Sequence, residues 1–401
     1  MSEPQKVMTI TLMRGDLYDS PVYSGAYLQL PASEYEIQDA LERARISGDQ
    51  PYRIVECFNS QGDYLECIPE DPSLAELNFL AKRISGMENH EKLTFTNCVA
   101  MEKNPLDMKK LINITYNLKD CHTISGISND KALGEFYVEN EMVEELRDAP
   151  QWMLKYLDYE KIGRAYREAE KGSFIGNSYI FNFNTEFEEV YDGVHLLEQP
   201  AAEDYVFKLL ICDDEFYPDY PEDEEACSCL KLPATADEIA CVLKEQYSSL
   251  DECVIYKNES TIPRLNGVFS DYEDIDKIRL LADRINELKD QGMMAKYKAV
   301  LEFTDCTDLD LALDLAKNLN CFDFYPEMSA PEDYGRLALL KASGLKPEDP
   351  ALKLLRFEWY GYAMMEQDGV GTTEYGLVRR NEKELLLEYS QPSKEMGQQM
   401  L

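Results

Sequence analysis

The sequence repeats itself at an interval of about two hundred residues, and this repeat constrains the fold more than any other feature. The stretch LKYLDYEKIGRAYREAEKGSF, which begins at Leu154, returns as LKLLRFEWYGYAMMEQDGVGT from Leu352. Three further pairs of similar stretches keep the same order along the chain, and they begin at Leu28 and Leu230, Asn78 and Arg279, and Leu106 and Leu309. A fixed order at a fixed spacing indicates a tandem duplication.

Each copy has the same predicted layout of strands and helices. Apolar stretches predict strands at Val7–Met13, Tyr205–Ile211, and from Tyr52 and Cys253. A Leu-x-Leu-Pro stretch ends a further strand, and its proline is expected to start helices at Ala32–Ala44 and Ala234–Gln246. An apolar period near 3.6 predicts helices at Leu74–Arg83 and Ile275–Leu288. Each copy then closes with the helix of the Leu154 or Leu352 stretch and a β-hairpin from Ser178 or Thr373.

We therefore expect an elongated, multi-domain α+β protein made of two tandem copies. Each copy has an N-terminal small α+β domain, a middle helical domain and a C-terminal helix-plus-β-hairpin domain. The predicted boundaries are 1–70, 71–149 and 150–200 in the first copy and 201–268, 269–347 and 348–401 in the second. The stretch between Tyr191 and Tyr205 spans at most about 50 Å. This short linker favours copies arranged as successive segments over a folded-back pseudo-dimer.

The charge balance excludes several classes of partner. The chain carries 77 acidic and 40 basic residues, a formal net charge of -37, and both halves are acidic. Such a chain repels nucleic acid and anionic membranes, and it attracts basic protein clefts. The N-terminus lacks a basic-then-apolar signal pattern, and no apolar run is long enough to span a bilayer. We expect a cytoplasmic protein without direct nucleic-acid or membrane contacts.

Two acidic stretches are candidate partner-binding surfaces. A helix expected at about Glu139–Ala149 would place four carboxylates on one face, namely Glu141, Glu144, Glu145 and Asp148. The stretch Cys212–Glu225 contains eight more, Asp213, Asp214, Glu215, Asp219, Glu222, Asp223, Glu224 and Glu225. The alternatives are an ordinary solvated helix face for the first stretch and a loop between two strands for the second. The second copy has no row that matches the first stretch.

The sequence offers no pattern that is typical of an enzyme or a metal site. His90, His122 and His195 are scattered, and Cys227-x-Cys229 lacks a second pair at zinc-like spacing. P-loop, dinucleotide-binding and nucleophile-elbow motifs are also missing. We predict a protein without catalytic residues, cofactor or metal. Single cysteines within apolar patterns are expected in the core, and these are Cys57, Cys98, Cys241 and Cys321. Asp308 is expected to cap a helix.

The stretch from Leu133 to Gly193 resembles the C-terminal third of the ArdA antirestriction proteins. In that family an Asp-Tyr-x-x-x-Gly-Arg helix leads through a Gly-x-Phe turn to a final hairpin ending in Glu-x-x-Tyr. The matching residues are Asp158, Tyr159, Gly163, Arg164, Gly172, Phe174, Glu188 and Tyr191. The second copy departs from this pattern, because Arg356 and Phe357 replace the Asp-Tyr pair and Tyr362 replaces the arginine.

The resemblance implies a non-enzymatic DNA mimic from a mobile genetic element. It implies that the protein occupies the DNA groove of type I restriction-modification enzymes and self-associates through C-terminal domains. A net charge of this size equals the charge on roughly 60 Å of duplex, about 18 base pairs. The alternative is an acidic scaffold protein of a mobile element that binds a protein surface other than a DNA groove. Phosphate-like rows of carboxylates favour mimicry, whereas an apolar patch ringed by polar residues favours a scaffold.

Overall fold

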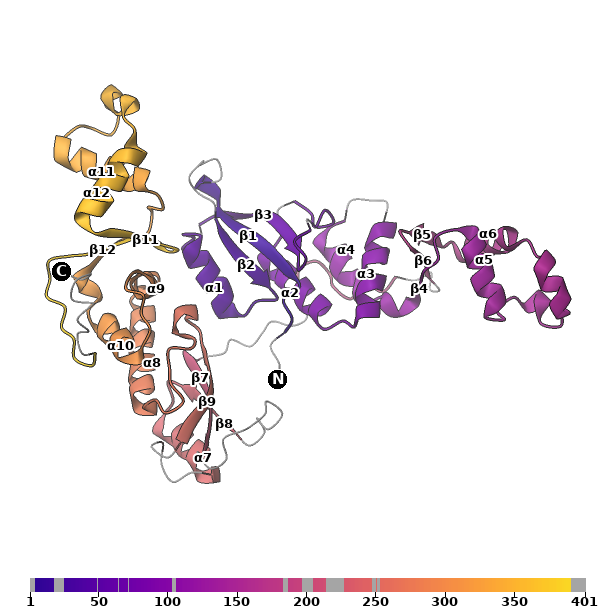
Figure 1. The fold of residues 1–401 in the computed structure, drawn as a ribbon, viewed down its shortest axis with the longest axis horizontal. Coiled ribbons are helices and arrows are strands. Elements are labelled where there is room, and N and C mark those ends of the chain that lie inside the picture. The colour runs from indigo at the N-terminus through magenta and orange to yellow at the C-terminus, as the bar shows by residue number, and fades with distance from the viewer. Residues whose placement is uncertain are drawn as a thin grey trace. The chain divides into compact units, whose positions relative to one another are not determined.

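The computed structural model describes residues 4–17, 25–48, 50–63, 65–70, 72–102, 106–182, 187–196, 205–213, 227–246, 250 and 253–390. These residues form twelve α-helices and four three-stranded sheets (Figure 1), which confirms a mixed α and β fold. The chain divides into two compact units. Unit 1 comprises Met1–Thr11, Tyr27–Ala32 and Ile54–Pro200, and unit 2 comprises Leu12–Ala26, Ser33–Arg53 and Ala201–Leu401.

Two of the sheets have the same strand order and occur at the predicted strands. One has the order β2-β1-β3, with β1 at Met8–Arg14, β2 at Ala26–Leu30 and β3 at Tyr52–Asn59. The other has the order β8-β7-β9, with β7 at Phe207–Asp213, β8 at Ser228–Leu232 and β9 at Cys253–Ser260. In both sheets the first strand in sequence is central. In β2 buried and exposed residues alternate, as expected for a strand with one face on a core.

Helix α1 (Glu34–Arg43) follows β2 and helix α7 (Ala236–Gln246) follows β8, but neither begins at the proline. Ser33 caps α1 in a capping box with Glu36, so serine and glutamate satisfy free N–H groups of the first turn. Thr235 and Glu238 exchange the same pair of hydrogen bonds before α7. Both predicted helices are therefore present, but each begins two residues after the predicted starts at Ala32 and Ala234.

The middle part of each unit is helical, and its first helix confirms the one that the apolar period predicts. In unit 1 they are α2 (Leu74–Ser85), α3 (Asn89–Met101) and α4 (Met108–Ile114). In unit 2 they are α8 (Ile275–Asp290), α9 (Met294–Phe303) and α10 (Leu309–Lys317). Helix α8 buries Ile275, Ile278, Leu281, Ala282, Ile285 and Leu288 along one side. Asp308 accepts a hydrogen bond from the N–H of Leu311, which confirms it as the N-cap of α10.

The other two sheets contain strands that the sequence analysis missed. In unit 1 the order is β4-β6-β5, with β4 at Cys121–Ser125, β5 at Ser173–Ile175 and β6 at Ser178–Asn182. In unit 2 the order is β10-β12-β11, with β10 at Phe322–Tyr325, β11 at Val370–Thr373 and β12 at Gly376–Arg380. β4 and β10 were not predicted. The hairpins are β5–β6 and β11–β12, so the predicted hairpin positions are displaced toward the C-terminus.

A pair of helices accompanies each of these sheets. Helix α5 (Asp130–Glu139) packs on α6 (Tyr159–Glu170), and α11 (Pro331–Ser343) packs on α12 (Phe357–Asp368). The Leu154 and Leu352 stretches begin in short 3-10 helices, and the α-helices start only at Tyr159 and Phe357. The repeated stretch is therefore two successive elements and not the single helix predicted.

After each hairpin in the sequence, a segment of the chain lies against the middle helices, and side chains of these helices hold it by hydrogen bonds. In unit 1 the Asn113 amide oxygen accepts from the N–H groups of Val190 and Tyr191, both at 2.8 Å. The Asn117 side chain donates a hydrogen bond to the Glu188 carbonyl oxygen and accepts one from the Glu188 N–H, both at 2.9 Å. The segment predicted as the second strand of a hairpin is therefore a strap held by two asparagines of the α4 region.

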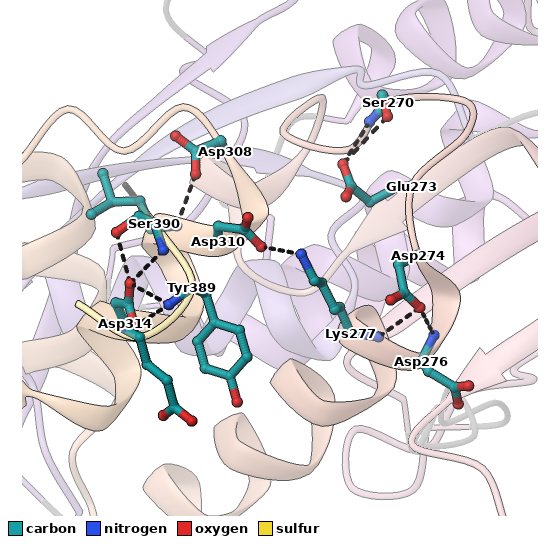
Figure 2. Close-up of polar contacts among 12 residues, drawn as sticks. Ser270, Glu273, Asp274, Asp276, Lys277, Asp308, Asp310, Asp314, Tyr389 and Ser390 are labelled. Atoms are coloured by element: carbon teal, nitrogen blue, oxygen red, sulfur yellow. Dashed lines mark hydrogen bonds and ion pairs between the residues drawn. The ribbon is translucent and has the colours of Figure 1, made fainter. Parts of the chain in front are cut away.

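The corresponding strap of unit 2 is held by a buried carboxylate. Asp314 on α10 accepts from the N–H groups of Glu388, Tyr389 and Ser390 and from the Ser390 hydroxyl, over 2.7–3.2 Å. Figure 2 shows these bonds converging on Asp314. Burial alone would raise the pKa of Asp314, but the bonds from Ser390, Glu388 and Tyr389 bring it below its usual value.

Unit 2 also contains a buried ion pair between α1 and α9. The Lys298 ammonium lies 2.7 Å from Asp39 and 2.8 Å from Glu42. Arg43 Nε and the Tyr375 hydroxyl complete the shell of Asp39 at 3.0 and 2.8 Å. Burial would raise the pKa of Asp39, and the charge of Lys298 and these hydrogen bonds lower it overall. A buried lysine needs such partners, because an unpaired charge is costly away from water.

Three of the four cysteines predicted in the core are buried, namely Cys57, Cys98 and Cys321. Cys241 is exposed on α7, so that prediction is wrong. It lines a shallow hollow between α7 and β8, together with Cys229, Lys231 and Val242.

Candidate protein-binding surface

The exposed face of α8 carries a row of carboxylates in unit 2. Asp276, Asp283, Glu287 and Asp290 are exposed, while the opposite side of the helix is buried. Their spacing of seven, four and three residues keeps them on one side of an α-helix. Asp276 pairs with Arg279 at 3.1 Å and Glu287 pairs with Arg284. Asp283 and Asp290 make no hydrogen bond or ion pair with the described part of the chain.

The density of this row can be compared with that of a nucleic-acid strand. At a rise of about 1.5 Å per residue, the four carboxylates cover roughly 21 Å of helix axis. One strand of B-DNA places about six phosphates over that length, since they recur every 3.4 Å along the axis. The row therefore supplies roughly two thirds of the charge of one strand before the four basic residues of α8 are counted, namely Lys277, Arg279, Arg284 and Lys289. It is sparser than DNA, but it lies on a helix fixed by a buried face.

Other carboxylates beside this row have local structural roles (Figure 2). Asp274 caps α8 by accepting from the N–H groups of Asp276 and Lys277, and Glu273 accepts from Ser270. Asp310 on α10 lies 2.7 Å from the Lys277 ammonium and raises the pKa of that lysine. These acids stabilise helix starts and an interhelical ion pair. Their negative charge nevertheless adds to the potential around the α8 row.

The predicted row from Glu141 to Asp148 does not lie on a helix. Helix α5 ends at Glu139, Glu141 has a positive φ of 57°, and Glu144–Leu146 form one turn of 3-10 helix. The four carboxylates remain exposed, but helical spacing does not place them on one face. The expected helix is therefore wrong. A role for Glu141, Glu144, Glu145 and Asp148 in partner binding stays a prediction.

The second predicted stretch lies almost entirely outside the described residues. This applies to Asp214, Glu215, Asp219, Glu222, Asp223, Glu224 and Glu225, while Asp213 is the last residue of β7. The α8 row was not predicted, because its four acids are spread over the whole helix and alternate with basic residues. Its signal in the sequence is the periodic spacing of acids within an amphipathic helix.

Apolar side chains are exposed near the start of α12 in unit 2. Leu354 is 86% exposed, Trp359 72% and Tyr362 60%. In unit 1, Trp152 and Tyr156 are exposed at the 3-10 helix before α6. Exposed apolar side chains close together on one helix, as Trp359 and Tyr362 are on α12, are typical of protein contacts.

The side chains that could support catalysis or metal binding do not converge in the described residues. His90 and His195 are exposed and pair with Glu88 and Asp192, and His122 is exposed on β4. Within the described ranges, no three His, Cys, Asp or Glu side chains are arranged to hold a metal ion. None of the helices described is both long and apolar enough to cross a membrane.

The geometry thus defines, as a class, a strongly acidic protein with an ordered row of carboxylates and a separate exposed apolar surface. A comparison with known protein families shows that part of the chain is similar to one of them. Residues 16–181 match the antirestriction protein (ArdA) family. The matched segment contains Asp158, Tyr159, Gly163 and Arg164. No curated protein matches the chain.

Proposed function

We propose that this chain is an antirestriction protein that mimics DNA and occupies the DNA-binding groove of type I restriction-modification enzymes. The family match over residues 16–181 supports the antirestriction class. The exposed α8 row is the observation that carries the mimicry, because two of its carboxylates have no partner in the described part of the chain. A basic groove that is built for phosphates offers such carboxylates the cations they lack.

We further propose that the chain consists of two ArdA-like copies. The equal strand orders β2-β1-β3 and β8-β7-β9, and β4-β6-β5 and β10-β12-β11, support this. The straps add support, since Asn113 and Asn117 stand where Asp314 and Asn318 stand in the second copy. The α8 row lies beyond the matched residues, so its role rests on this duplication.

The proposed mechanism is non-enzymatic and needs no cofactor. Inhibition follows from competition, because the acidic surface and DNA exclude each other from one groove. Part of the binding free energy comes from release of counterions held at the basic groove, as in DNA binding. The partners are therefore the basic clefts of restriction-modification or other defence enzymes in the cytoplasm.

Competition with DNA tests the proposal. A purified type I restriction-modification enzyme is bound to a fluorescent duplex that contains its recognition site, and the full chain is added. We expect displacement of the duplex, loss of cleavage, and an affinity for the enzyme that falls steeply between about 50 and 200 mM salt. Binding that leaves the duplex in place would favour the scaffold alternative. An absence of binding to the enzyme would reject both the target and the mimicry.

A further inference from the structure

Two free thiols face each other in unit 1, where the end of α3 meets the start of β4. The sulfur atoms of Cys98 and Cys121 lie 3.1 Å apart, and both cysteines are free. Cys98 is buried in the last turn of α3, and Cys121 is half-buried at the first position of β4. Disulfide sulfurs lie about 2.05 Å apart, so an approach of about 1 Å would join the pair.

The environment distinguishes the two thiols. Cys98 donates a hydrogen bond to the Cys121 sulfur, and this bond lowers the pKa of Cys121. The same bond, together with burial, raises the pKa of Cys98. The thiolate is the nucleophile in thiol–disulfide exchange. Cys121 is therefore both the more accessible and the more readily ionised member of the pair.

We propose that Cys98 and Cys121 form an intramolecular disulfide on exposure to a small oxidised disulfide such as glutathione disulfide. The Cys121 thiolate attacks one glutathione sulfur, forms a mixed disulfide and releases one glutathione thiolate, which takes up a proton. Cys98 then loses its proton to water, attacks the Cys121 sulfur and expels the second glutathione. Two cysteine thiols are oxidised, and one glutathione disulfide is reduced to two thiols.

The disulfide closes a loop that contains α4. That helix region carries Asn113 and Asn117, which hold the strap of unit 1. Closing the loop restricts the unfolded chain and stabilises unit 1. At the corresponding positions of α9 and β10 unit 2 has Ala299 and Phe322, so this pair of thiols has no counterpart there. Formation of the Cys98–Cys121 disulfide is separate from the proposed inhibition and requires no partner protein.

Peptide mapping of the full chain after oxidation tests the proposal. The reduced protein is incubated with glutathione disulfide, alkylated and digested, and the peptides are identified by mass spectrometry. We expect a linked Cys98–Cys121 peptide in the parent and a higher thermal midpoint of unit 1. Cys98→Ala, which introduces the residue found at Ala299, should accumulate a stable glutathione adduct on Cys121. Cys121→Ser should give neither the linked peptide nor an adduct on Cys98.

The exposed thiols Cys229 and Cys241 report whether the oxidant reaches the chain. Glutathione adducts on these two residues without a linked peptide would overturn the proposal. A Cys121 adduct that persists in the parent would also overturn it, because Cys98 would then have failed to attack. Circular dichroism of the reduced variants checks that each one folds. A glutathione adduct on Cys121 in Cys98→Ala shows that Cys121 still reacts with the oxidant, so the lack of a linked peptide in that variant results from the loss of the Cys98 thiol.

Discussion

Gly163 on α6 lies so close to Asp130 at the start of α5 that a Cβ on the glycine would overlap the Asp130 carbonyl oxygen. The same position would place that Cβ 2.7 Å from the backbone nitrogen of Gly134. In unit 2 a Cβ on Gly361 would overlap the Pro331 carbonyl oxygen in the same manner. The two helix pairs therefore cross with backbone against backbone, and each crossing requires glycine.

Replacing Gly163 with alanine should separate α5 from α6. The added methyl group cannot move around backbone atoms, so we expect a loss on the order of 3 kcal/mol in the free energy of unfolding of unit 1. The Asp130–Arg167 ion pair, now 2.7 Å, should weaken too. Urea unfolding measures the change. Gly86→Ala is the control, because its Cβ would meet only ordinary contacts of 3.7 Å or more; equal losses in both variants would contradict the packing argument.

Asp314 should make the stability of unit 2 depend on pH. Its pKa is lower in the folded chain than in the unfolded chain. It therefore contributes stability above the unfolded pKa of about 3.9, and this contribution is lost as pH falls through the folded pKa. Asp314→Asn should lower the free energy of unfolding at pH 7 by about 1–3 kcal/mol, because an amide cannot accept all four bonds.

The difference between Asp314→Asn and the parent should shrink as the pH is lowered toward 3. Thermal unfolding at a series of pH values measures it. Asn113→Ala removes the equivalent neutral anchor in unit 1 and should give a difference that does not change with pH. A pH-independent difference for Asp314→Asn would show that its negative charge plays no part in holding the strap.

Lys298→Met should destabilise unit 2 more than the loss of any exposed ion pair. The substitution leaves Asp39 and Glu42 without the cation between them. Removal of one member of a buried pair costs about 3–5 kcal/mol. Lys277→Met removes a partly exposed pair with Asp310 and should cost less than about 1 kcal/mol. Urea unfolding compares the two variants, and similar losses would mean that water reaches Lys298.

Self-association should depend on the exposed apolar residues before and on α12. We expect the chain to pair with a second copy through Leu354 and Trp359, because burying them removes apolar surface from water. The double variant Leu354→Asp, Trp359→Ala should raise the dissociation constant of the dimer at least about tenfold, equal to 1.4 kcal/mol. Analytical ultracentrifugation measures it. Tyr272→Ala, which removes an exposed aromatic elsewhere in unit 2, is the control.

Much of the local structure could be predicted from the sequence, because β1, β3, α2 and α8 follow simple periodicities. β4 and β10 could not, since each has only four or five residues and pairs with a strand more than fifty residues away. The sequence of Glu188–Tyr191 is typical of a strand. The segment instead hydrogen-bonds to the side chains of Asn113 and Asn117, which are distant in the sequence, so its structure could not be predicted locally. The expected helix through Glu141 fails because α5 ends at Glu139.

The role proposed for the α8 row can be tested against that predicted for the Glu141–Asp148 stretch by neutralising two sets of equal size. The α8 set is Asp276→Asn, Asp283→Asn, Glu287→Gln and Asp290→Asn. The second set is Glu141→Gln, Glu144→Gln, Glu145→Gln and Asp148→Asn. Each variant removes four negative charges from the chain and replaces each carboxylate by an amide of almost the same shape. The overall charge and the long-range attraction to a basic groove therefore change equally in the two variants.

We expect the α8 variant to displace DNA from the type I enzyme at least about tenfold less well than the parent, a loss of about 1.4 kcal/mol. Its salt dependence should also become shallower, because fewer charges meet the groove. The second variant should change by less, since its carboxylates do not form one helical face. Competition titrations at about 50 and 200 mM salt measure both. If the second variant loses more than the α8 variant, the groove is recognised through unit 1 and the role proposed for α8 is wrong.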